Sequence, residues 1–115
     1  MISDTGGTRV YIARGATDMR KSINGLSLLV EEPFELDLFS GSLFAFCNRK
    51  RNIVKILYWP GNGFALWMKR LEVDRFCWPD SEQEVMAVTQ TALAWLLNGL
   101  DVTQAHRQLA YGAVT

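Results

Sequence analysis

The stretch from Leu38 to Leu71 limits the possible folds of this chain more than any other part of its sequence. It holds three runs rich in aromatic and β-branched residues, 42–48, 53–59 and 64–71, separated by the four-residue connections 49–52 and 60–63. Connections this short join antiparallel neighbours, so the stretch predicts a three-stranded meander. It also holds six basic residues and no acidic one, in a chain whose formal net charge is zero.

The two connections also predict the register of the strands. If both loops hold four residues, Asn48 lies opposite Ile53 and Trp59 lies opposite Phe64. One face of the sheet then carries Phe44, Phe46, Lys55, Leu57, Trp59, Phe64, Leu66, Met68 and Arg70, and the other carries Leu43, Ala45, Cys47, Val54, Ile56, Tyr58, Trp67, Lys69 and Leu71. Because both faces are largely apolar, we expect both to be covered.

A strand and a helix are predicted before the meander. Residues 9–13 have the β-branched and aromatic content of a strand. Thr17 or Asp18 is then a candidate helix cap, because either side chain can accept hydrogen bonds from amides of the first turn. Apolar residues at spacings of three and four follow as far as about Glu32, and Pro33 ends the pattern.

A short strand and a second helix are predicted after the meander. Residues 75–78 resemble a fourth strand of the centre, ended by Pro79. Residues 89–97 have a helical pattern with Thr89 as the N-cap, and Gly99 stands where a left-handed C-terminal cap belongs. The predicted fold class is therefore α+β: a small antiparallel sheet, a meander of four or five strands, packed with two α-helices.

Length and composition predict one domain. The chain has 115 residues, of which 49% are hydrophobic and 21% charged, as in an ordinary globular protein. We expect the domain to span residues 1–103. The C-terminal tail, 104–115, shows no pattern beyond one helical turn, so it is expected to be disordered or to form that turn alone.

The two cysteines, Cys47 and Cys77, each lie in an apolar run and are expected to be small buried hydrophobes. A bridge between neighbouring strands is the alternative. With a single histidine, the chain offers little for a Cys/His zinc site, and no cofactor is expected. The first residues do not resemble a signal peptide, and no apolar run approaches the roughly 20 residues that span a bilayer. We therefore expect a cytoplasmic protein without a membrane partner.

The basic residues are unevenly distributed. Residues 41–75 hold seven basic and two acidic residues, whereas residues 76–115 hold one basic and four acidic residues. Such an asymmetry is typical of a local site for a polyanion or an acidic partner. The candidate residues for contact with DNA or a protein partner are Arg49, Lys50, Arg51, Lys55, Trp67, Lys69 and Arg70.

Each of these candidates also has a purely structural interpretation. Arg49–Arg51 would form a solvated hairpin tip that discourages edge-to-edge aggregation. Lys55, in the middle of an apolar strand, would line a functional groove in the functional interpretation. In the structural one it would extend its ammonium to solvent or pair with a carboxylate. Trp59 and Trp67 would stack on bases or anchor a partner in the functional interpretation, and belong to the core in the structural one.

A second candidate site lies at the predicted start of the first helix. Asp18 suits the helix N-terminus as a cap. Arg20 and Lys21 are unfavourable for the helix dipole there, so capping does not explain them. Together with free N-terminal amides they would form an anion site for a phosphate or a carboxylate.

Catalysis has little support in the sequence. There is no phosphate-binding loop of the P-loop type, and His106 has no nucleophile to serve. A metal-dependent nuclease needs carboxylates gathered around divalent ions, which would require Asp37, Glu72 or Asp74 to converge. We therefore expect no catalytic residue and no metal site.

Several blocks of the sequence jointly resemble one protein family. They are Thr17-Asp18-Met19-Arg20-Lys21, Phe39-Ser40-Gly41 with Leu43-Phe44 and Phe46, Asn48-Arg49-Lys50-Arg51, Lys55-Ile56-Leu57-Tyr58-Trp59, Gly61-Asn62-Gly63-Phe64, Lys69-Arg70-Leu71-Glu72, Phe76 with Trp78-Pro79, and Trp95-Leu96-Leu97-Asn98-Gly99-Leu100. In order and spacing they resemble the small TnpB-type accessory protein of the insertion-sequence-66 family of bacterial transposable elements, over about residues 9–102. Pro60 and Asp74 depart from the common pattern, which has aspartate and glycine there.

The resemblance implies a role in transposition beside a separate, larger transposase, without a catalytic activity of its own. The leading hypothesis is an accessory factor that contacts DNA, the transposase or both through the basic hairpin surface. The alternative is a protein adaptor without DNA contact, which would present an exposed apolar patch including Trp67 or Trp59.

Overall fold

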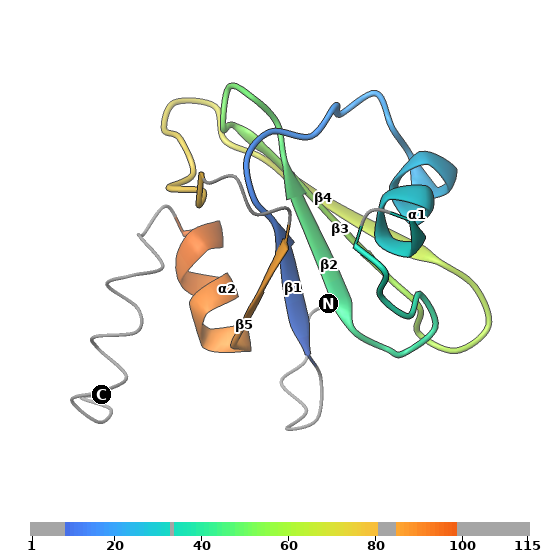
Figure 1. The fold of residues 1–115 in the computed structure, drawn as a ribbon. Helices are drawn as coiled ribbons and strands as arrows, with labels where there is room; N and C mark the ends of the chain where they lie inside the picture. Colours follow the sequence, from blue (N-terminus) through green and yellow to red (C-terminus); the bar gives the residue numbers. More distant parts are fainter. Residues whose placement is uncertain (1–8, 33, 81–84, 99–115) are drawn as a thin grey trace.

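The computed structural model describes residues 9–32, 34–80 and 85–98, and Figure 1 shows their arrangement. The elements follow the chain in the order β1 (Val10–Ala13), α1 (Ile23–Glu31), β2 (Leu43–Cys47), β3 (Ile53–Tyr58), β4 (Ala65–Arg70), β5 (Val85–Val88) and α2 (Gln90–Leu97). Five strands form one open sheet and the helices lie on its two sides, so the predicted α+β class is confirmed.

The sheet has the strand order β4-β3-β2-β1-β5. The meander β2-β3-β4 is confirmed, and its register is the predicted one, because Cys47 pairs with Val54 and Tyr58 pairs with Ala65. The prediction of a purely antiparallel sheet is wrong, since β1 runs parallel to β2. The long connection that contains α1 allows this, because a parallel pair needs a crossover of a dozen or more residues.

Strand alternation divides the core into two layers. Phe44, Phe46 and Leu57 face α1 and pack with its buried residues Leu26 and Val30. On the opposite face, the sheet residues Val10, Ile12, Ala45 and Ile56 pack in one cluster with Leu93 and Leu96 of α2. The predicted cover on both faces is thus confirmed, and Figure 1 shows α1 and α2 on opposite sides of the sheet.

The first helix begins later than predicted. Its N-cap is Ser22, which makes no side-chain capping bond, so the prediction of Thr17 or Asp18 as the cap is wrong. The physical reason is a separate turn: the backbone N–H groups of Arg20 and Lys21 donate to the Asp18 carboxylate and carbonyl, respectively. Asp18 therefore caps this turn and is not available to the helix.

The segment predicted as a fourth strand, 75–78, is irregular. Its bonds leave the ladder pattern: the Phe76 N–H donates to the Arg51 carbonyl over 2.7 Å, and Trp78 Nε1 donates to the Ala13 carbonyl over 2.8 Å. Both aromatic side chains are buried, so their apolar character reflects the core and not strand pairing.

The C-terminal part of the described chain holds one element that the pattern did not predict. Strand β5 pairs antiparallel with β1 at the edge of the sheet. The predicted second helix is confirmed with its cap, because Thr89 Oγ1 accepts from the Ala92 N–H over 3.0 Å. The predicted cap at Gly99 and the tail 104–115 lie outside the described residues.

The two cysteines remain thiols and have different surroundings. Cys47 is fully buried in β2, and burial raises the pKa of its thiol to about 12. Cys77 is exposed, so the prediction that both are buried is wrong for this residue. It lies between Phe76 and Trp78, whose side chains are both buried, so the chain turns only the side chain of position 77 toward solvent there.

Two strand lysines bind backbone carbonyls. The Lys55 ammonium donates to the carbonyls of Met19 and Lys21 over 2.8 and 3.0 Å and so holds the turn before α1 against β3. The Lys69 ammonium donates to the Leu97 carbonyl over 2.9 Å at the C-terminal end of α2. A cation is favourable there, because the last carbonyls of a helix have no intrahelical partner.

The two thiols should differ in reactivity, because only an accessible thiolate attacks a disulfide reagent. In the native protein we expect one fast-reacting thiol with Ellman's reagent at pH 8, and none in the Cys77→Ser variant until denaturant is added. Fast labelling of Cys77→Ser under native conditions would contradict the burial of Cys47.

The hydrogen bonds of the Lys55 ammonium should contribute measurably to the free energy of unfolding. We expect Lys55→Met to lower the free energy of unfolding by about 2 kcal/mol, because it removes charge-assisted hydrogen bonds to two carbonyls. The matched control is Lys50→Met, the same substitution at an exposed side chain, for which we expect a change within about 0.5 kcal/mol. Urea denaturation followed by tryptophan fluorescence measures both. Equal stabilities for the two variants would contradict a structural role of Lys55.

Candidate functional site

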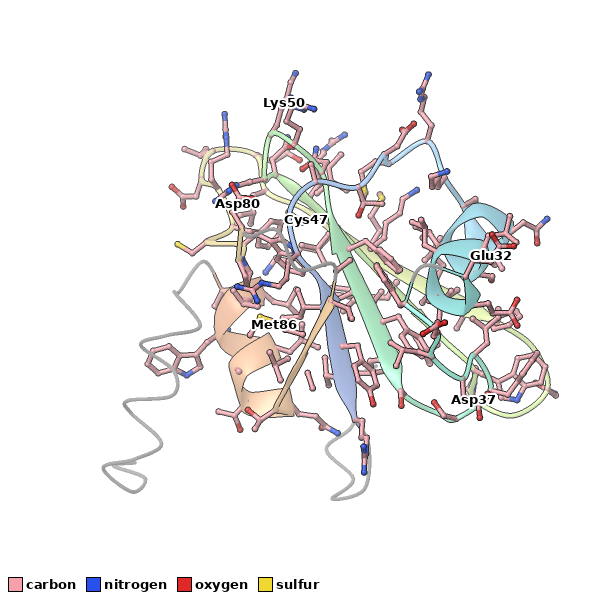
Figure 2. All side chains as sticks on the ribbon, viewed as in Figure 1. Glu32, Asp37, Cys47, Lys50, Asp80 and Met86 are labelled. Atoms are coloured by element: carbon pink, nitrogen blue, oxygen red, sulfur yellow. The ribbon has the colours of Figure 1, made fainter. Side chains whose placement is uncertain are left out.

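The connection between β2 and β3 is a tight turn built on Asn48. Its Oδ1 accepts from the backbone N–H groups of Asn52 and Ile53 over 3.0 and 3.1 Å, and its Nδ2 donates to Asn52 Oδ1 over 2.7 Å. Arg51 adopts a φ of 61°, a left-handed conformation that lets the chain reverse. Arg49 and Lys50 therefore project from the tip of a braced turn, and Figure 2 shows Lys50 beyond the end of the strands.

The cations of this turn differ in how they are engaged. Arg49 and Lys50 are exposed, and neither side chain makes an ion pair or hydrogen bond within the described part of the chain. Arg51 pairs with Asp80 over 3.2 Å, and Arg70 at the end of β4 pairs with Glu72 over 3.0 Å. Pairs this exposed contribute about 0–1 kcal/mol, so an incoming anion can replace the carboxylate at small cost.

The remaining predicted binding residues do not join this surface. Lys55 points to the α1 side of the sheet and Lys69 to the α2 side, and both ammonium groups are bound to carbonyls. Trp67 is half-buried and packs against the core on the α2 side. The seven predicted residues therefore form two groups. Four cations lie at the turn and at the end of the edge strand β4, whereas Lys55, Lys69 and Trp67 make contacts within the fold.

Two cations that the sequence pattern did not single out lie at the same end of the sheet. Arg14 directly follows β1, which runs parallel to β2 and ends beside it. Arg75 precedes Phe76, whose backbone N–H is bound to the carbonyl of Arg51. No local pattern predicts either position, because each depends on the topology around the turn.

We call this group of cations, gathered where β1, β2 and β4 end and β3 begins, the basic end. Its exposed members are Arg49, Lys50, Arg70 and Arg75, and the half-buried Arg14 and Arg51 lie beside them. Glu72, Asp74 and Asp80 lie in the adjoining connections and compensate part of the charge. In the view of Figure 2, Lys50 and Asp80 mark this end, and Asp37 lies far from it.

The second predicted site takes a different form from the one expected. The Arg20 guanidinium binds both carboxylate oxygens of Asp18, with Nε–Oδ1 at 3.0 Å and Nη2–Oδ2 at 2.8 Å. Hydrogen bonds from the Arg20 side chain and backbone lower the pKa of Asp18 to about 2. Asp18, Arg20 and Lys21 thus lie in the turn that precedes α1, and the prediction that they form the helix start is wrong.

The carboxylates proposed for a metal-dependent nuclease are not brought together. Asp37 lies in the connection that leads into the beginning of β2, whereas Glu72 and Asp74 follow the end of β4. The strand register puts these two positions at opposite ends of the sheet. Within residues 9–32, 34–80 and 85–98, no group of three or more His, Cys, Asp or Glu residues is placed to hold a metal ion.

Three aromatic rings lie at the end of the sheet away from the basic end. Trp59, just after β3, packs edge-on against Phe39 and Phe64, with ring centroids 5.0 and 4.9 Å apart. Phe39 is 56% exposed, whereas Trp59 and Phe64 are half-buried. Of the two tryptophans named for an apolar patch, Trp59 therefore belongs to a surface cluster and Trp67 to the core periphery.

Comparison with known proteins gives two relatives that match over most of the chain. Both come from Sinorhizobium fredii (strain NBRC 101917 / NGR234). "Uncharacterized protein y4hO" is 38% identical over 101 residues, which cover 88% of this chain and 88% of that protein. "Uncharacterized protein y4jC" is 30% identical over 108 residues, which cover 94% of this chain and 92% of that protein.

No solved structure matches the chain. Among the helices of the described residues, neither is long and apolar enough to cross a membrane. The model of one protein family, described as "IS66 Orf2 like protein", matches residues 8–107 and so includes the basic end, the aromatic rings and both helices. The chain therefore belongs to the IS66 Orf2-like family.

Proposed function

We propose that this protein is a non-catalytic accessory factor in the transposition of its insertion element, and that its basic end contacts the phosphate backbone of DNA. Membership of the IS66 Orf2-like family supports the accessory role. In this proposal the transposase of the same element performs the chemistry, and the present protein positions DNA for it. A role in the cytoplasm, where such a reaction takes place in bacteria, is part of the proposal.

The observation that carries the proposal is the state of Arg49 and Lys50. Both are exposed at the tip of a turn and have no carboxylate partner in the described part of the chain. Binding to DNA gains most of its affinity from cations that displace the counterions of phosphates, and a cation without a partner loses no ion pair when it does so. The side-chain network of Asn48 and Asn52 holds the turn in one conformation, which lowers the entropy lost on binding.

The same geometry favours contact with the backbone over reading of bases. The tip presents long, exposed cations on the turn between β2 and β3. These two strands lie within a sheet that is packed on both faces, so they do not form a free ribbon that could enter the major groove. Phosphate contacts fix position and orientation but carry no direct sequence information. We therefore propose that sequence choice belongs to the transposase and that this protein adds affinity with little preference of its own.

The proposal is tested by comparing the same charge-reversing substitution, arginine to glutamate, at the two ends of the molecule. Arg49→Glu should weaken binding to a labelled duplex that carries the terminal repeats of the element, by about tenfold at low salt. The slope of log K against log salt should become shallower by about 0.9 for each phosphate that the variant no longer neutralises. Fluorescence anisotropy across a salt series measures both quantities.

The matched control is Arg9→Glu, which makes the same change at an exposed arginine just before β1, at the other end of that strand. We expect it to retain most of the affinity and an unchanged salt slope. Equal losses for the two variants would reduce the effect to overall charge and contradict a localised contact. Wild-type protein that does not bind the duplex even at low salt would refute DNA contact altogether.

The lysine variants provide a crossed test of the same surface. Lys50→Met should weaken duplex binding without loss of stability, because Lys50 is exposed at the tip and its side chain has no partner among the described residues. Lys55→Met should lose stability and keep its affinity, because its ammonium is bound to the carbonyls of Met19 and Lys21. The two measurements are anisotropy below the melting range and urea denaturation. The reverse outcome would relocate the contact from the tip to the sheet face.

A further inference from the structure

The end of the sheet opposite the basic end carries an aromatic cluster, formed by Phe39, Trp59 and Phe64. Each pair of rings is in contact, with centroid distances of 5.0 Å for Phe39–Trp59, 5.7 Å for Phe39–Phe64 and 4.9 Å for Trp59–Phe64. The rings come from two connections, because Phe39 lies between α1 and β2 and the other two flank the β3–β4 turn. Figure 1 shows these connections beside each other at one end of the molecule.

The cluster is layered from the core to the solvent. Phe64 packs against the buried residues on the α1 side, and Phe39 forms the outer layer with 56% of its surface exposed. Interactions between rings hold Phe39 in place although it contributes little to the core. An exposed phenylalanine held by two further aromatic residues is the kind of anchor that protein interfaces use, because aromatic residues dominate interface hot spots.

The surroundings of the cluster are acidic. The backbone N–H of Phe39 donates to Asp37 Oδ1 over 3.0 Å, so this carboxylate lies at the backbone of the residue that carries the outermost ring. Residues 34–42 contain Glu35 and Asp37, residues 58–66 contain no charged residue, and neither stretch contains a lysine or arginine. Both Glu35 and Asp37 are exposed. A duplex phosphate would be repelled here, whereas a cation would meet carboxylates and electron-rich ring faces together.

We infer that the aromatic cluster and Asp37 form the docking site for a segment of the transposase that presents an arginine or lysine beside an apolar side chain. The apolar side chain would cover Phe39, and the cation would lie against a ring face within reach of the Asp37 carboxylate. This inference rests on the proposed function, because it takes the transposase as the partner of an accessory factor. It assigns the two partners to opposite ends: DNA to the basic end and the transposase to the aromatic cluster.

The complementary charge argues for a basic occupant. A second copy of this chain could also supply one, through its own Arg49–Lys50 tip. Such an association would be head-to-tail, and head-to-tail contacts that do not close into a ring continue as filaments. A head-to-tail association would also cover the cations proposed to contact DNA. The observations therefore favour the transposase as the occupant, and the experiment below distinguishes it from self-association.

The experiment measures the affinity of purified full-length protein for the purified transposase of the same element by titration calorimetry. Phe39→Ala should weaken this binding at least tenfold. Leu28→Ala is the matched control, because it truncates an apolar side chain that is equally exposed, at 54%, but lies on α1 outside the cluster; its affinity should stay within twofold. Asp37→Asn keeps an oxygen for the Phe39 N–H and removes the charge, so it should weaken binding several-fold and make the remainder less salt-dependent.

Two further measurements decide between the outcomes. Duplex binding should be unchanged in Phe39→Ala, so failure of the DNA contact and failure of the docking site are separate results. Equal transposase affinities for Phe39→Ala and Leu28→Ala would overturn the inference. So would sedimentation of the wild-type protein as a concentration-dependent oligomer that Phe39→Ala converts to monomer, because the occupant would then be a second copy.

Discussion

The pairing register of β2, β3 and β4 is the constraint on which the rest of the structure depends. Two short connections fix it, so that Cys47 lies opposite Val54 and Tyr58 opposite Ala65. Side chains alternate between the two faces along each strand, so a slip of one residue would move every side chain of a strand to the opposite face. The apolar surfaces against which the two helices pack would then be lost. The same register sends the Arg49–Arg51 turn to one end of the sheet and the aromatic rings to the other.

The fold was predictable where the signal is local and depended on tertiary contacts elsewhere. The meander and the Thr89-capped helix follow from turn residues, apolar periodicity and a capping side chain. The parallel pairing of β1, the edge strand β5 and the late start of α1 do not. Asp18 shows the difficulty: its sequence context suits a helix cap, yet the competing turn with Arg20 determines its role.

The cations at the tip of the turn were predictable from the sequence, whereas the other residues around the candidate site were not. Arg49 and Lys50 stand in a charged turn and were recognisable as exposed. Lys55 and Lys69 occupy strands, and sequence cannot reveal that two ammonium groups are bound to the carbonyls of a turn and of a helix end. The exposed Arg75 and the half-buried Arg14 lie at this end of the sheet only because the topology returns distant segments to it. Counting charges along the chain therefore overestimates the number of cations available for binding on the sheet faces. It underestimates their number at the end of the sheet.

Among the described residues, the basic end and the carboxylates near Phe39 lie at opposite ends of the strands, and this separation contributes an electric dipole moment although the formal net charge of the chain is zero. A neutral particle gains little long-range attraction to a polyanion, but the field of the duplex exerts a torque on its dipole. The protein would turn during its approach, so that Lys50 leads and Asp37 trails, as the view in Figure 2 allows the reader to follow. Orientation would then precede contact, and the ionic strength of the solution would set the distance at which that rotation begins.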